Sequence, residues 1–84
     1  MKIVFEEGKI WAKTEHGEAE LDYRIKDNHM IIYHTGTPEE DRGKGIAEEL
    51  TDKAFEFAKK NGLRIIPACP YTQYYIRKKK ITEY

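Results

Sequence analysis

The first half of the chain alternates between apolar and polar positions, which is the pattern of half-buried strands. Three short segments, residues 3–5, 9–14 and 18–25, are rich in β-branched and aromatic residues and are separated by Glu7-Gly8 and His16-Gly17. A glycine after a polar residue is typical of tight turns. The third segment alternates strictly, which predicts one buried face made of Ala19, Leu21, Tyr23 and Ile25. We therefore expect an antiparallel meander.

Two nearly continuous apolar runs predict further strands. His29 to Thr35 follows a turn at Lys26-Asp27-Asn28, and such a run is expected of a central strand covered on both faces. Leu63 to Ile66 is the second run. A helical pattern lies between the two, and a helix that leads directly into a strand implies a crossover. We expect the second run to pair parallel with the first.

The helical pattern covers residues 46–60. Its apolar positions recur at spacings of three and four, and they are Ile46, Ala47, Leu50, Ala54, Phe57 and Ala58. Asn61-Gly62 is a typical end signal. Further on, Pro70 suits the first position of a short second helix with Cys69 as its cap residue. The fold class is mixed α/β: an antiparallel meander, a strand–helix–strand crossover and a short C-terminal helix.

Composition narrows the class of protein. With 84 residues there is room for one domain, residues 1–84. The 15 basic and 15 acidic residues balance, which counts against a nucleic-acid partner, and the basic run at residues 77–80 suits the last turn of a helix. No apolar stretch is long enough to span a membrane, and no secretion signal precedes the first strand. We expect a cytoplasmic protein.

The most informative segment is Arg42-Gly43-Lys44-Gly45-Ile46-Ala47, between a buried strand and an amphipathic helix. Glycines allow a ligand to approach the backbone closely, and the first amides of a helix have no partner within it. An anion such as a pyrophosphate is stabilised there by N–H groups and the helix dipole. The alternative is that these glycines only form a turn.

The same segment carries a family resemblance. Arg42, Gly45 and Ala47 match the Q/R-x-x-G-x-G/A signature of the GNAT (GCN5-related N-acetyltransferase) superfamily. The blocks His34-Thr35 with Pro38, and Ile66-Pro67 with Cys69-Pro70-Tyr71, are similar to those of its minimal single-domain members. The resemblance runs from about residue 12 to residue 76.

The resemblance implies a shortened GNAT fold that binds acetyl-CoA. It places the pyrophosphate on the amides of Arg42, Gly43, Lys44, Gly45, Ile46 and Ala47. It places the pantetheine arm beside the strand end at Thr35, Gly36 and Thr37, with Tyr71 also at the cofactor. In GNAT folds the two parallel strands separate at their carboxyl ends, where open α/β sheets bind ligands.

Two residues are candidates for catalysis. Cys69 would cap a helix, where the dipole stabilises a thiolate, and the resemblance suggests that it accepts the acetyl group. The alternatives are that it is a buried filler or that it only lines the pocket while an amine attacks acetyl-CoA directly. His34 can serve as a general base or can simply fix the strand end by hydrogen bonding. Tyr71, Tyr74 and Tyr75 can protonate the departing thiolate or can be core residues.

Two functions follow from these residues. The first is an acetyl-CoA-dependent N-acetyltransferase that acts on an amine of a protein or a small molecule. The second is a module that binds CoA or acyl-CoA with little turnover, since the shortened fold lacks the elements that usually form an acceptor site. No spacing of histidines and carboxylates is typical of a metal site, so we expect no metal.

Overall fold

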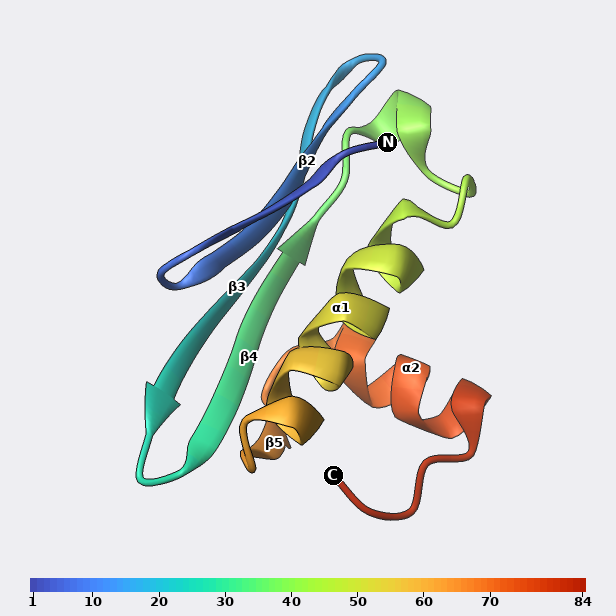
Figure 1. Ribbon diagram of the computed structural model, residues 1–84. Coiled ribbons are helices and arrows are strands. Elements are labelled where there is room, and N and C mark those ends of the chain that lie inside the picture. Colours follow the sequence, from blue (N-terminus) through green and yellow to red (C-terminus); the bar gives the residue numbers. More distant parts are fainter.

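In the computed structural model of residues 1–84, five strands form one sheet, and Figure 1 shows how the helices lie against it. The strands are β1 (Ile3–Glu6), β2 (Lys9–Thr14), β3 (Gly17–Lys26), β4 (His29–Gly36) and β5 (Arg64–Pro67), and they follow chain order across the sheet. β1 to β4 pair antiparallel, whereas β5 pairs parallel with β4. The predicted meander and crossover are confirmed.

Local chemistry explains the longest hairpin, between β3 and β4. Its connection is Asp27-Asn28, and both residues have positive φ, 50° and 64°. A two-residue turn of this kind matches the right-handed twist of antiparallel strands, and Asn and Asp tolerate positive φ better than most residues. The turn therefore fixes the register of β3 against β4.

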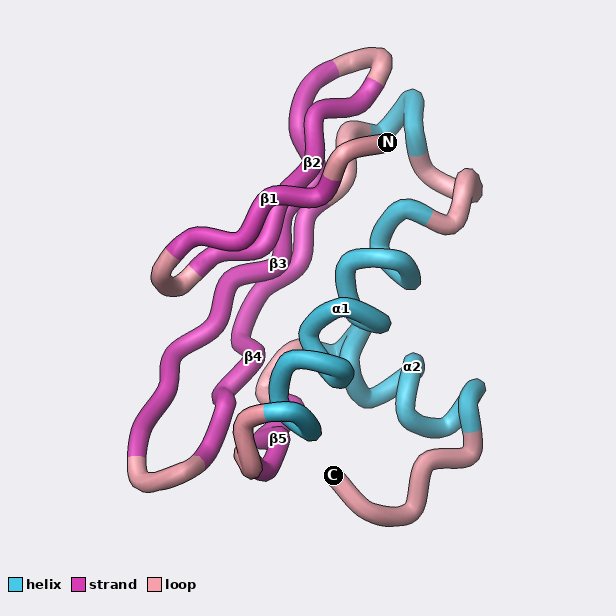
Figure 2. The backbone as a smooth tube through the Cα atoms, viewed as in Figure 1, coloured by secondary structure: helices cyan, strands magenta, loops and turns pink.

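Helices cover one side of the sheet. A short 3-10 turn, η1 (Glu39–Asp41), precedes α1 (Ile46–Lys60), and α2 (Pro70–Lys79) follows β5. Cys69 is the N-cap residue of α2, and Pro70 begins the helix as expected. Figure 2 shows sheet and helices as two layers, with α1 and α2 on the same side. Neither helix has the length and apolar character that a membrane crossing requires.

The core lies between the sheet and α1. Its fully buried members include Ile10, Leu21, Met30, Ile32, Leu50 and Ala54. The expectation that β4 is covered on both faces is wrong, because both helices lie on one side, and Tyr33 is 46% exposed. Ile25, expected in the core, is 50% exposed because it lies near the end of the β3–β4 hairpin. The other face of the sheet, which we call the outer face, carries no helix.

Candidate functional site

A cleft of about 550 Å³ lies between the end of β4, the turn before α1 and one face of α2. Its lining consists of Thr35, Gly36, Thr37, Asp41, Arg42, Gly43, Gly45, Ile46, Ala47, Glu48, Tyr71, Tyr74 and Lys78. Three segments that are far apart in the sequence meet here. The lining residues include every residue that the sequence predicts at the cofactor except Lys44.

The turn between η1 and α1 presents free backbone amides to this cleft. Gly43 and Gly45 have φ of 83° and 80°, a conformation that favours glycine. Gly45 is the N-cap of α1 and offers no side chain to its amides. The amides from Gly43 to Glu48 donate to no backbone carbonyl, and the Glu49 amide is the first to bond, to the Gly45 oxygen at 3.1 Å. The positive end of the helix dipole is therefore uncapped.

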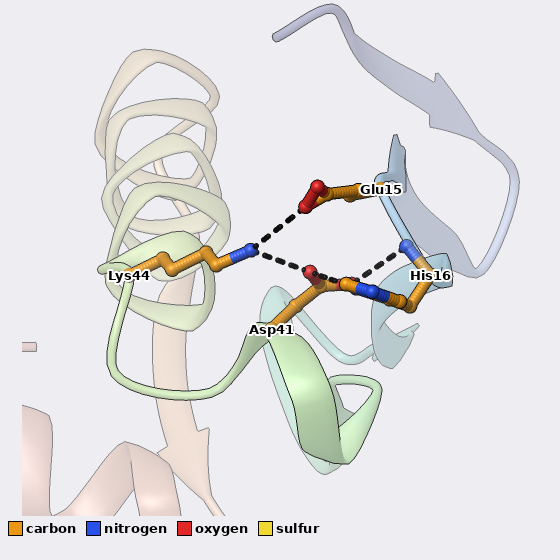
Figure 3. Close-up of polar contacts among 4 residues, drawn as sticks. All are labelled: Glu15, His16, Asp41 and Lys44. Atoms are coloured by element: carbon orange, nitrogen blue, oxygen red, sulfur yellow. Dashed lines mark hydrogen bonds and ion pairs between the residues drawn. The ribbon is translucent and has the colours of Figure 1, made fainter.

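Asp41 anchors this turn to the β2–β3 hairpin (Figure 3). Its side chain is completely buried, and its carboxylate accepts hydrogen bonds from the His16 amide at 3.0 Å and the Lys44 ammonium at 2.8 Å. His16 Nδ1 lies 2.9 Å from the same carboxylate. Hydrogen bonds from Lys44 and His16 hold the pKa of Asp41 well below its usual range, although burial alone would raise it.

Lys44 is the one predicted binding residue that does not line the cleft. Its ammonium contacts Asp41 and, at 3.6 Å, Glu15, on the hairpin side of the turn (Figure 3). The physical reason is the buried carboxylate of Asp41, which requires a cation. Asp41 itself was missed by the sequence reasoning, because nothing in the run Glu39-Glu40-Asp41 indicates which carboxylate is buried.

One face of α2 lines the cleft opposite the turn between η1 and α1, and we call this face the α2 wall. Tyr71, Tyr74 and Lys78 stand at spacings of three and four, so they share one helix face. Lys78 donates to Glu48 at 2.6 Å, and Lys79 lies 3.2 Å from the same carboxylate. The Lys78 contact holds the pKa of Glu48 below its usual range. Sequence reasoning assigned the basic run to the helix dipole alone and so missed Lys78, although the spacing from Tyr71 could have indicated it.

A β-bulge in β4 decides which side chains face the cleft. Asp22 pairs with His34 and Tyr23 pairs with Ile32, so Tyr33 has no partner in β3. Directly opposed residues share a face, and Leu21, which pairs with Thr35, is buried in the core. The extra residue therefore turns Thr35 toward the helices and His34 toward the outer face.

His34 is consequently not brought to the cleft. Its ring lies on the outer face with the carboxylates of Glu20 and Asp22, and the ligand atoms of the three side chains lie within 4.8 Å of one another. A hydrogen bond with Asp22 raises the pKa of Glu20. The predicted role of His34 as a base at the thioester stays a prediction, and the bulge at Tyr33 is a physical argument against it.

β4 and β5 separate next to Thr35 and Cys69. The last paired residues are Ile32 and Pro67, and the Ala68 amide still bonds to the Ile32 oxygen at 3.0 Å. β4 continues to Gly36, so no strand pairs with its edge from Tyr33 onward. Thr35 Oγ1 lies 3.6 Å from Cys69 Sγ across this opening.

Cys69 does not line the cleft; it is buried, with 4% of its surface exposed, and it contacts Thr35, which does line the cleft. Burial raises the pKa of its thiol, but nearby donors that favour the thiolate, namely the Thr72 and Tyr71 amides and the Thr35 hydroxyl, outweigh burial, and the net pKa is lowered. Amides at the start of a helix act in this way on a capping cysteine. The thiol is therefore more acidic than an ordinary one.

Comparisons with known proteins agree with one another. The model of the family described as GCN5-related N-acetyl-transferase matches residues 9–84. The NMR structure of a GCN5-like protein from Staphylococcus aureus superposes with a TM-score of 0.78 at 30% identity, covering 94% of this chain and 80% of that one.

Curated relatives share the same region. Protein NATD1 from Homo sapiens is 30% identical over 70 residues, which is 82% of this chain and 62% of the relative. Protein NATD1 from Gallus gallus shows the same identity, with 64% of its length covered. The chain thus spans less than two thirds of the length of these relatives.

Proposed function

This chain belongs to the GCN5-related N-acetyltransferase family, and on that premise we propose that its cleft binds acetyl-CoA and that the protein transfers the acetyl group to an amine. Members of the family generally use acetyl-CoA as the acetyl donor. The fold class and the family support a donor site. The acceptor amine, on a protein or a small molecule, is left open.

The row of unpaired amides from Gly43 to Glu48 carries this proposal. These groups need a partner, and they stand at the positive end of a helix that spans Ile46–Lys60. A pyrophosphate supplies several acceptor oxygens and negative charge at one place, so it satisfies both the amides and the dipole. Arg42 lines the same cleft and adds a permanent positive charge.

The free edge of β4 suits the pantetheine arm. From Tyr33 to Gly36 the strand has no neighbour on the β5 side. Pantetheine carries amide groups, which can pair with exposed strand edges as another strand would. An arm that starts at the turn and follows β4 toward the opening beside Thr35 brings the thioester toward Cys69.

Cys69 is the proposed acetyl acceptor. Its thiolate attacks the thioester carbonyl, the bond between that carbon and the CoA sulfur breaks, and CoA leaves as a thiolate. An amine then attacks the acetyl-cysteine, its proton passes to solvent, and the Cys69 thiolate is restored. His34 is not part of this route, because the bulge turns it to the outer face.

Binding is tested with two glycine variants. Gly45 has φ of 80° in the cleft, and Gly62 has φ of 67° beyond the end of α1, and a Cβ at either meets nothing within 4 Å. Both Gly45→Glu and Gly62→Glu therefore bear backbone strain of about 1–2 kcal/mol. Calorimetry with CoA should show binding lost in Gly45→Glu alone. Equal affinity in Gly45→Glu and the parent would move the site elsewhere.

Acetyl transfer is tested by mass spectrometry. Incubated with acetyl-CoA and no amine, the protein should gain one acetyl group on Cys69 that hydroxylamine removes, and Cys69→Ala should gain none there. A parent that acetylates an amine without this label, with Cys69→Ala equally active, would show direct attack by the amine. CoA binding without label or transfer would leave a binding module.

A further inference from the structure

Thr72 carries a hydroxyl that the fold itself does not use. The residue is fully buried in the first turn of α2, and its Oγ1 has no hydrogen-bond partner. An unpaired buried hydroxyl lowers stability, because in the unfolded chain it bonds to water. Thr51 is equally buried, but its hydroxyl donates to the Ala47 carbonyl at 2.7 Å. Helix geometry accounts for Thr51 and leaves Thr72 unexplained.

The position of Thr72 relative to Cys69 suggests its partner. Cys69 is the N-cap residue of α2, and Thr72 follows it by three positions. The side chain of an N-cap residue lies against the residue three positions on, which is the geometry of a capping box. Thr35 approaches the same sulfur from β4, 3.6 Å away. Thr35 thus contacts the sulfur from β4, and Thr72, three positions after Cys69, is the buried hydroxyl of α2 that stands in sequence where it can reach the same sulfur.

We propose that Thr72 is a positioning residue for Cys69: its buried hydroxyl donates to the sulfur when the thiol ionises, and with Thr35 it holds the thiolate toward the opening between β4 and β5. The neutral thiol is a weak acceptor, so the Thr72 hydroxyl is unpaired before ionisation and becomes paired after it. The role of Thr72 in acetyl transfer rests on the proposed function. The hydrogen bond that we propose from Thr72 to the ionised sulfur does not depend on that function.

The electrostatics around Cys69 agree with the proposal. Burial raises the Cys69 pKa, and the donors that would stabilise its thiolate, the Thr72 hydroxyl among them, lower it. Neighbouring groups do not titrate in the same range: burial raises the pKa of Tyr71 and Tyr75, and Lys78 lowers that of Glu48. His34 of β4 is turned to the outer face. A titration followed at the sulfur therefore reports Cys69.

The test is the pH profile of iodoacetamide labelling at Cys69, with thiolate absorbance as a second readout. Thr72→Val should raise the midpoint by about one pH unit, the size expected for one lost hydrogen bond to a charged group. Thr72→Ser should restore the parent midpoint, because it keeps the hydroxyl. Thr51→Val removes a buried hydroxyl from α1 and should leave the midpoint unchanged.

Stability separates positioning from a purely structural role. Thr72→Val removes an unpaired oxygen and should unfold at the same or a higher urea concentration than the parent. An unchanged labelling midpoint in Thr72→Val, or in Thr72→Ala if the valine variant does not fold, would overturn the proposal. A raised midpoint in a protein that forms no acetyl-cysteine would retain the role of Thr72 and remove the proposed mechanism, so the two failures are distinguishable.

Discussion

Asp41 illustrates how one side chain can hold together two parts of the molecule that are distant in sequence. Its carboxylate is buried and yet ionised, since the His16 amide, the His16 ring and the Lys44 ammonium surround it. A buried charge is tolerated only when it is paired and hydrogen-bonded. Asp41 therefore links the β2–β3 hairpin to the turn between η1 and α1, which we call the glycine turn.

Acid should weaken the contacts that Asp41 makes with His16 and Lys44. The folded state lowers the Asp41 pKa, whereas in the unfolded chain an Asp has a pKa of about 3.9. The stability that Asp41 contributes is therefore fully present above about pH 4 and is lost as the pH falls from there toward the folded pKa. Urea unfolding at a series of pH values should show Asp41→Asn less stable than the parent at neutral pH.

The same measurement contains its control. The difference in free energy of unfolding between Asp41→Asn and the parent should narrow below about pH 4, because the Asp41 carboxyl of the unfolded parent then takes up a proton that the folded parent does not bind. Glu40→Gln alters the exposed neighbouring carboxylate and should stay close to the parent throughout. A gap of constant width at all pH values would mean that the ionised form of Asp41 contributes nothing.

At the scale of elements, the sequence predicts the strands and helices well, because each has a clear period. Residues 46–60 carry a helical stripe, and α1 covers Ile46–Lys60. The bulge at Tyr33 lies beyond such reasoning, since it depends on how β3 and β4 pair. Simple alternation from Met30 and Ile32 would turn His34 inward and Thr35 outward, the reverse of what is found.

The sequence likewise predicts only part of the candidate site. Glycines before a helix are a local signal, and the turn from Arg42 to Ala47 does line the cleft. The α2 wall is a tertiary feature, because Lys78 reaches the cleft only when α2 packs against α1. Lys44 was misplaced for a related reason, namely that its partner Asp41 is buried by the β2–β3 hairpin.

The α2 wall makes a prediction about CoA binding. Lys78 lines the cleft opposite the glycine turn, where it can contact a phosphate of the nucleotide. Lys78→Ala should raise the Kd for CoA about tenfold, because one hydrogen bond between charged groups is lost. Lys80→Ala, at the end of α2 and outside the lining, should bind within about twofold of the parent. Equal affinities in calorimetry would show that α2 does not touch the nucleotide.

The whole molecule is a two-layer structure with one covered face. Core residues such as Leu50 on α1 pack against Ile10, Leu21 and Ile32 on the sheet. On the outer face Ile66 is 40% exposed. A chain of 84 residues buries a smaller share of its surface than a larger domain does, so each core side chain carries much of the stability.

The difference between the covered face and the outer face of the sheet can be measured as a difference in the free energy of unfolding of two variants. Leu50→Ala should lower the free energy of unfolding by about 2–5 kcal/mol, because it leaves a cavity in the single core. Ile66→Ala, on the outer face, should cost less than about 1 kcal/mol, since much of its side chain already meets water. Denaturant unfolding of both variants compares the two faces, and similar losses would mean that the outer face is covered in solution.

The strand order has a consequence for how the protein folds. Because β1 to β5 lie side by side in chain order, most pairings join segments close in sequence, and such topologies fold rapidly. The meander can assemble first, whereas the row of free amides faces a complete cleft only after β5 and α2 have docked. A nucleotide bound there would therefore favour the fully docked state and hold the last-formed part of the molecule in place.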